Sequence, residues 1–221
     1  MPLTITELSE GIAYWRNTRW PQDFHRAFYS RMQAANPQGR FTQDWWDTFP
    51  PELTKWKALR PKSPSLVTTR AVGRFQRLSQ AWVECMTEDV LTSDIAQVEW
   101  PRVAPFVEII SEIKDVASPV FPSKFCHFLV PCIFPVVDNA AMGNSFPSYK
   151  AYYETAQAEW LETSEEQRVR LAALLTREMG GCPKFNYPVR CKIIELCLIG
   201  RQQSHRYAPS SLHLKSSLRR I

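Results

Sequence analysis

The side chains best suited to chemistry in this sequence are a lysine and an aspartate that bracket one apolar run. The stretch FPSKFCHFLVPCIFPVVDN at 121–139 carries Lys124 near its start and Asp138 near its end, 138 − 124 = 14 residues apart. Burial among the neighbouring phenylalanines and the positive end of a helix both disfavour a charged amine. A lysine kept neutral in this way can attack an electrophilic carbon and form a Schiff base.

Serine and proline dipeptides predict the elements that hold these two side chains. SP and PS pairs just before Lys124 are typical of a helix entry, so we expect the lysine in or next to the first turn of a helix through Leu129. Two further prolines turn the chain before PVVDN, which places Asp138 as the cap of a helix beginning at Asn139. A capping carboxylate stays ionised and can stabilise a developing oxocarbenium ion at a sugar C1.

The segment SKFCHFLVPCIFPVVDNAAMG resembles the active-site segment of helix-hairpin-helix DNA glycosylases of the 8-oxoguanine type. In that family a lysine follows a hairpin at a helix start, and a Pro-Val-Asp element after an apolar helix supplies the catalytic carboxylate. Lys124 matches the Schiff-base lysine and Asp138 matches the carboxylate. The resemblance implies an enzyme that flips a base out of DNA and cleaves its N-glycosidic bond. It also implies an all-α fold of two helical subdomains with the DNA cleft between them.

The hairpin before the lysine departs from the family. The residues SPVFPSK lack the glycine-rich turn that holds a DNA phosphate there, so we expect an altered or absent hairpin. The implied substrate is an oxidised purine or a modified base of invading phage DNA, which corresponds to DNA repair or antiviral defence. If Lys124 forms a Schiff base, strand cleavage at the abasic sugar can follow; otherwise the amine positions an attacking water. This chemistry needs no metal and no cofactor.

Aromatic and polar side chains supply the candidates for substrate binding. His127 follows Lys124 by one turn and can either contact a base or pack in the core. Trp45 and Trp46 can stack on an extruded base, with core burial as the alternative. The candidate substrate-binding residues are His127, Asn139, Trp45, Trp46, Phe185 and Tyr187.

Charge is distributed unevenly along a chain whose net charge is +5. Residues 1–80 hold 12 Lys/Arg against 6 Asp/Glu, residues 81–200 hold 10 against 16, and residues 201–221 hold 5 against none. Two basic ends suit a polyanion-binding surface, although solvated faces would look the same. The candidate DNA-backbone contacts form two stripes, one of Arg70, Arg74 and Arg77 and one of Lys184, Arg190 and Lys192.

Few glycines and an apolar spacing of three to four residues predict a mainly helical chain. We expect one domain over 1–200, with a possible subdomain boundary near 60–65, and a basic, flexible tail over 201–221. The least regular part is 41–65. The expected helices include one capped by Thr6, a single helix over 66–86, one over 98–113, one after Pro147, one capped by Ser164, and one over 188–200 that ends at Gly200.

Several classes of protein do not fit the sequence. The six cysteines form no CxxC pair, which argues against a structural zinc site. The first residues do not follow a signal-peptide pattern, and the apolar runs are shorter than a membrane span. We expect a cytoplasmic monomer that binds DNA. The competing hypothesis is a non-enzymatic DNA-binding or protein-interaction module; the enzyme requires that Lys124 and Asp138 face one open cleft.

Overall fold

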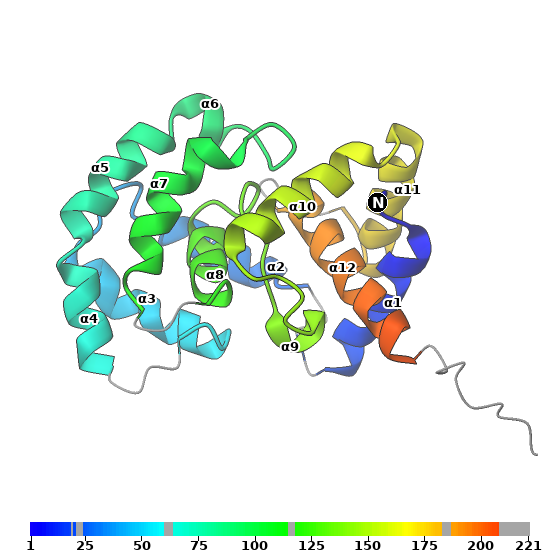
Figure 1. The fold of residues 1–221 in the computed structure, drawn as a ribbon, viewed down its shortest axis with the longest axis horizontal. Helices are drawn as coiled ribbons and strands as arrows, with labels where there is room; N and C mark the ends of the chain where they lie inside the picture. Colours follow the sequence, from blue (N-terminus) through cyan, green and yellow to red (C-terminus); the bar gives the residue numbers. More distant parts are fainter. Residues whose placement is uncertain (19, 21–23, 60–63, 115–117, 183–186, 208–221) are drawn as a thin grey trace, which may run out of the picture.

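The computed structural model describes residues 1–18, 20, 24–59, 64–114, 118–182 and 187–207 of the chain. These residues form twelve α-helices and no strand, which confirms the predicted all-α class. Figure 1 shows the helices in two groups with further helices between them. One group holds α3 (Gln43–Lys55), α4 (Pro64–Val72), α5 (Phe75–Cys85), α6 (Glu88–Leu91) and α7 (Trp100–Ser111).

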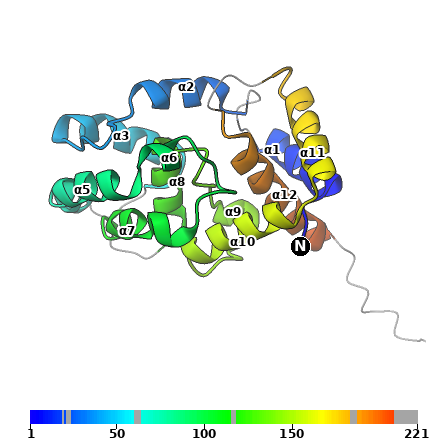
Figure 2. The same ribbon diagram turned by 90° about the horizontal axis from the view of Figure 1, so that it is seen from above.

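The other group contains both ends of the described chain. It consists of α1 (Ile5–Asn17), α10 (Tyr149–Glu162), α11 (Glu165–Glu178) and α12 (Val189–Tyr207). Seen from above, α12 runs beside α1 and α11 (Figure 2). Helix α10 reaches from this group to contact α7 and α8.

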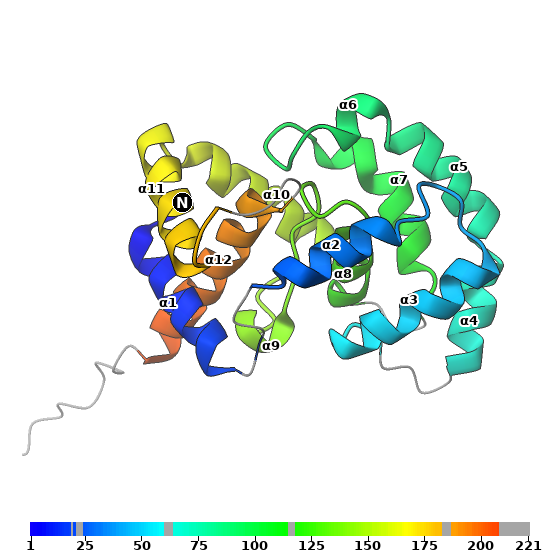
Figure 3. The same cartoon turned by 180° about the vertical axis from the view of Figure 1, so that it is seen from behind.

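Three helices lie between the groups: α2 (Arg26–Ala34), α8 (Val120–Leu129) and α9 (Asn139–Met142). Helix α2 packs across α8, as the view from behind shows (Figure 3). Every residue of α8 from Phe121 to its end is buried, so this helix forms the centre of the molecule. The apolar run that suggested a catalytic segment is therefore also the core element against which both groups pack.

Two glycines allow α1 and α12 to cross at very short range. A Cβ added to Gly11 would lie 1.9 Å from the carbonyl oxygen of Leu196, and one added to Gly200 would lie 1.9 Å from that of Glu7. The expectation that Gly200 ends the last helix is wrong, because α12 continues through it to Tyr207. The helix therefore extends into the segment expected as a tail, whose remainder, 208–221, lies outside the described residues.

Capping side chains set the start of several helices, and some of the predicted caps and bounds need correction. Thr4 rather than Thr6 caps α1, in a reciprocal capping box with Glu7. Ser148 and Ser164 cap α10 and α11, the latter as predicted. The expectation of a single helix over 66–86 is wrong, because the helix is interrupted at Gly73 and divides into α4 and α5.

The segment expected to be irregular, 41–65, contains the regular helix α3. The helix persists through Pro50 and Pro51 because Trp46, Phe49 and Leu53 bury one of its faces. Residues 60–63 lie outside the described residues, and α3 and α4 on either side of them belong to the same group of helices.

Candidate active site

Lys124 lies in the buried centre of α8. The helix runs from Val120 to Leu129, so the lysine is its fifth residue and lies next to the first turn, as the sequence predicted. Only 4% of the residue is exposed. Its Nζ donates a hydrogen bond of 2.7 Å to the carbonyl oxygen of Trp56, the residue that follows α3. Burial, rather than the end of a helix, is therefore the main influence on this amine.

Asp138 caps α9, as the sequence predicted. Its Oδ1 accepts hydrogen bonds from the backbone N–H groups of Ala140, at 3.0 Å, and Ala141, at 3.2 Å. Its Oδ2 lies 3.7 Å from the Nζ of Lys124, which makes an ion pair across the two ends of the apolar run. The aspartate side chain is 18% exposed and the lysine side chain 6%, so solvent reaches the pair mainly at the carboxylate.

The segment that carries Asp138 is tied to helices on two sides. The hydroxyl of Ser123, next to the lysine, accepts from the N–H of Val137 at 3.1 Å and donates to the carbonyl of Val120 at 3.0 Å. From α10, the hydroxyl of Tyr152 donates to the carbonyl of Val136 at 2.7 Å. Ser123 and Tyr152 were not among the predicted site residues, because a serine and a tyrosine carry no local sign of a long-range hydrogen bond.

Opposing influences act on the charge of Lys124. Burial lowers the pKa of its amine below the ordinary value, whereas the charges of Asp138 and Glu195 and the bond to Asp138 raise it. Lys57 lowers it further. The net direction is downward, which increases the fraction of the amine that carries a lone pair at neutral pH. An amine that carries a lone pair can attack an electrophilic carbon.

His127 does not face a substrate site, which corrects the first alternative given for it. The residue is fully buried, with Nδ1 2.5 Å from the carbonyl oxygen of Phe134 and Nε2 2.6 Å from the hydroxyl of Tyr29. Since a carbonyl only accepts, Nδ1 carries the proton and Nε2 accepts from the tyrosine. Burial, reinforced by Lys192, lowers the pKa of this histidine to about 3. The ring is a neutral core group with both nitrogens occupied.

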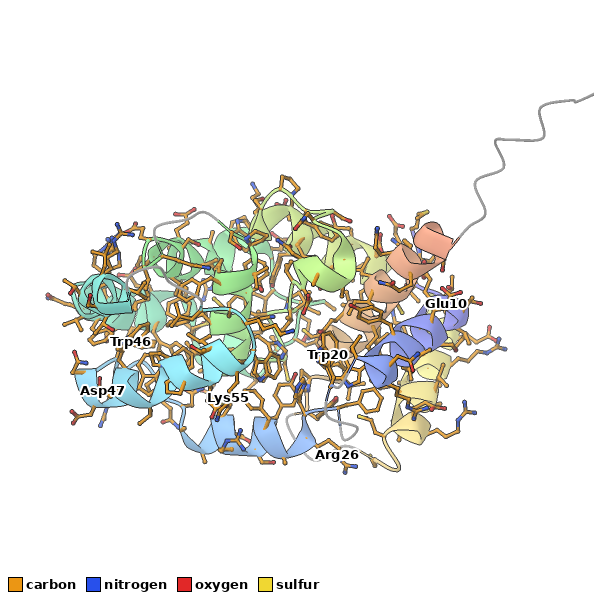
Figure 4. The ribbon with its side chains drawn as sticks, turned by 90° about the horizontal axis from the view of Figure 1, so that it is seen from below. Glu10, Trp20, Arg26, Trp46, Asp47 and Lys55 are labelled. Atoms are coloured by element: carbon orange, nitrogen blue, oxygen red, sulfur yellow. The ribbon has the colours of Figure 1, made fainter. Side chains whose placement is uncertain are left out.

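The expected stacking residues belong to the core or to its edge. Trp46 is 1% exposed and points into the group of α3 to α7, while its neighbour Asp47 lies outside (Figure 4). Trp45 is half-buried and packs on Phe49 with ring centroids 4.5 Å apart. Burial excludes Trp46 as a stacking platform in this conformation.

Of the other substrate-binding candidates, Tyr187 is buried and donates to the carbonyl of Phe24 at 2.9 Å. Asn139 is half-buried at the first position of α9, directly after the carboxylate. Phe185 lies outside the described residues. Among the candidates in the described residues, Asn139 directly follows the Asp138 carboxylate of the ion pair in the chain.

The first basic stripe is divided by the break between α4 and α5. Arg70 lies on α4, while Arg74 and Arg77 both bind the carboxylate of Glu112, at 3.0 Å and 2.8 Å. These two arginines are at least partly exposed, so they remain on the surface as a cluster neutralised in part by one acid. The single row along one helix that the spacing predicted is not formed.

The prediction that Lys192 belongs to a second basic stripe on the surface is wrong. This residue is fully buried, and its Nζ lies 2.7 Å from Oε2 of Glu195 in α12. Arg190 is exposed and forms an ion pair with Asp94. Lys184 lies outside the described residues. Positions 190 and 192 lie about 200° apart around a helix, so their side chains point to nearly opposite sides. Positions 192 and 195 share a face.

Concave surfaces occur elsewhere on the molecule. A cavity of about 410 Å³ lies at the C-terminal end of α8, where Tyr29, Trp82 and Phe128 contribute to its lining. A second, of about 250 Å³, lies between α9, α10 and α12. Neither cavity is lined by Lys124 or Asp138. The amine and the carboxylate are thus brought together, but beneath the surface, and neither of these two cavities is the open cleft that the enzyme hypothesis requires.

The described residues contain neither a cluster of metal ligands nor a membrane-spanning helix. No three His, Cys, Asp or Glu side chains within the described ranges come together in a way that would hold a metal ion. None of the helices in the described part of the chain is long and apolar enough to cross a membrane. Comparison with known proteins yields no match among protein-family models, curated proteins or solved structures.

Proposed function

We propose that this protein is a DNA glycosylase that extrudes a damaged or modified base and cleaves its N-glycosidic bond. The observation that carries the proposal is the Lys124–Asp138 pair, with 3.7 Å between amine and carboxylate at two ends of one buried segment. Two backbone N–H groups hold the carboxylate, and burial favours the neutral amine. The resemblance in sequence covers these same two residues. Action as a cytoplasmic monomer, in DNA repair or in defence against phage DNA, belongs to the same proposal.

The roles of the two side chains follow from their surroundings. Asp138 caps α9, and its carboxylate stabilises the positive charge that develops at C1′ as the base departs with the bonding electrons. The lone pair of the Lys124 amine then forms a bond to C1′, and the amine transfers a proton to the departed base, which is released neutral. Opening of the sugar ring gives an iminium ion, which water hydrolyses to release the enzyme. In a variant of this route, the amine orients a water that attacks C1′ instead.

A second candidate function is a non-enzymatic DNA-binding or interaction module. Its supporting observation is that the amine of Lys124 is 2.7 Å from a backbone carbonyl and that its side chain is 6% exposed. In this reading the lysine clamps α8 to the end of α3, and Asp138 acts as a helix cap alone.

Borohydride trapping together with base release separates the two candidates. The substrates are duplexes that carry oxidised purines, phage-type modified bases or an abasic site. We expect a covalent complex or a free base from the wild type, neither from Lys124→Met, and a much slower reaction from Asp138→Asn. Lys150→Met is the matched control, because Lys150 forms an exposed pair with Glu154 on α10 and should behave as the wild type. Equal DNA binding by all variants without base release from any duplex would favour the module.

A further inference from the structure

Arg201 joins three helices in one network of charges beneath the surface. Its Nε donates to Oε1 of Glu7 in α1, and its Nη1 donates to Oε1 of Glu159 in α10, both at 2.6 Å. Helix α12, which carries the arginine, lies between those two helices (Figure 1). The side chain of Glu159 is 9% exposed, and those of Arg201 and Glu7 are each 16% exposed. Polar atoms this far from water need hydrogen-bond partners other than bulk solvent.

Two atoms of the network lack such a partner. Within the described part of the chain, Oε2 of Glu159 and Nη2 of Arg201 are buried, and no side chain or backbone group bonds to them. The ammonium group of Met1 lies 3.9 Å from the other carboxylate oxygen, Oε1, and pairs more closely with Glu162, at 2.9 Å. An unpaired polar atom in a buried charged group is costly. One acceptor and one donor therefore remain for a further molecule to bond.

Both unpaired atoms belong to side chains that line the same cavity, the one of about 250 Å³ between α9, α10 and α12. Met142, Phe146 and Leu198 give this cavity apolar walls. Pockets for drug-sized ligands measure about 300 to 1,000 Å³, so this one suits a smaller molecule. Neither Lys124 nor Asp138 contributes to its lining, which separates it from the pair that carries the proposed function.

The charges of the network select the class of ligand. Two carboxylates share one guanidinium group, so the formal charge of the three side chains is 1 − 2 = −1, which disfavours an anion. An ammonium ion would bond to Oε2 of Glu159 and leave Nη2 of Arg201 without an acceptor. An uncharged amide satisfies both, because its N–H donates and its carbonyl accepts. The ring of a lactam holds these two groups on one edge, whereas an open-chain amide is trans and directs them to opposite sides.

We propose that this cavity binds a small uncharged molecule with the amide edge of a lactam, about the size of a single ring. The N–H of the ligand donates to Oε2 of Glu159, and its carbonyl accepts from Nη2 of Arg201. The ring carbons pack against Phe146 and Leu198. Aliphatic lactams and pyrimidine bases such as uracil share this edge. The site does not depend on the glycosylase function, and it stands or fails by its own test.

The test is a titration of the full-length protein with δ-valerolactam, followed by NMR of ¹³Cε-labelled methionine, with Met142→Leu to assign the signal of the wall residue. We expect a saturable shift of the Met142 signal. N-Methyl-δ-valerolactam has the same ring without the N–H donor, and it should bind about tenfold more weakly or worse. Uracil is titrated in parallel: tighter binding than that of δ-valerolactam would assign the site to a base, and weaker binding to an aliphatic lactam. Equal binding of the two lactams, or no saturable shift with any probe, would overturn the proposal.

Two variants test the contacts. In Glu159→Gln the carbonyl oxygen of the amide can still accept from Arg201, which turns an N–H donor toward the cavity, so δ-valerolactam should bind about tenfold more weakly or worse. Glu154→Gln is the matched control, because it makes the same change at an exposed position of α10 and should bind as the wild type does. If Glu159→Gln does not fold, Ser145→Phe replaces it, since this change fills the cavity from an exposed position and leaves the network intact. An affinity equal to that of the wild type in Glu159→Gln or in Ser145→Phe would overturn the proposal.

Discussion

Replacement of Lys124 by methionine should remove activity and leave the protein slightly more stable. The change removes an ammonium group whose burial costs several kcal/mol, about 4 in this position. It also removes the bond to Trp56, worth about 2 kcal/mol, and the pair with Asp138, worth about 1. We therefore expect the free energy of unfolding at pH 7 to rise by about 1 kcal/mol, because the methionine fills the space of the lysine stem.

Lys192→Met is the matched control, and it should have the opposite effect. Asp138 keeps two backbone N–H donors and 18% exposure when Lys124 is lost, whereas Glu195 is 3% exposed and would be left with a buried, unpaired charge. Breaking a buried pair from one side costs about 3 to 5 kcal/mol. Both substitutions replace a lysine with methionine, so the difference between their free energies of unfolding reports the surroundings of the acid that is left behind.

Urea unfolding followed by tryptophan fluorescence gives both free energies, and its pH dependence gives an independent check. The pKa of Lys124 in the folded state lies below its ordinary value. At a pH between these two pKa values, the unfolded chain binds a proton that the folded chain does not. The stability of the wild type relative to Lys124→Met should therefore rise with pH up to about 10.5. A loss of more than about 2 kcal/mol in Lys124→Met at pH 7 would refute this reasoning and make the lysine a structural clamp.

Three further predictions concern the elements around the site. Gly11→Ala should lower the free energy of unfolding by about 3 kcal/mol or more, because its Cβ would meet a carbonyl of α12, while Gly73→Ala, with its nearest atom at 3.4 Å, should stay near the wild type in thermal melts. Ser123→Ala should cost about 1 to 3 kcal/mol in urea unfolding, since it leaves the N–H of Val137 without its acceptor; an unchanged midpoint would contradict this. Burial lowers the pKa of His127 from 6.5 to about 3, so between these values the unfolded chain binds a proton that the folded chain does not. As the pH is lowered through this range, the free energy of unfolding of the wild type should fall more steeply than that of His127→Gln, by about 1.4 kcal/mol per pH unit. Parallel plots of the two free energies against pH would contradict the neutral ring.

The sequence predicted the local features of the site and missed the long-range ones. The cap at Asp138 could be predicted because a carboxylate before a short helix is defined by its own neighbours. The contact of Lys124 with Trp56 joins residues 68 positions apart, and no local pattern encodes it. Similarly, Gly200 looked like a helix stop because a glycine has several uses, and only the crossing with α1 shows which one applies.

The misplaced basic residues have a simpler cause. Proximity in sequence places Lys192 in one stripe with Arg190, although residues two positions apart lie on nearly opposite sides of a helix. Its partner Glu195, three positions later on the same face, was the informative neighbour. The stripe over Arg70 to Arg77 assumed one continuous helix, and the break at Gly73 removed that geometry.

The most direct test of the account is the release of free base from modified DNA, measured by mass spectrometry under single turnover for the wild type and Asp138→Asn. Asparagine caps a helix about as well as aspartate, so the variant should fold, with a free energy of unfolding within about 1 kcal/mol of that of the wild type. We predict that the wild type releases a base from at least one oxidised or phage-type duplex and that Asp138→Asn is slower by about 100-fold or more. Equal release by both proteins, or no release by the wild type from any duplex, would contradict the central claim.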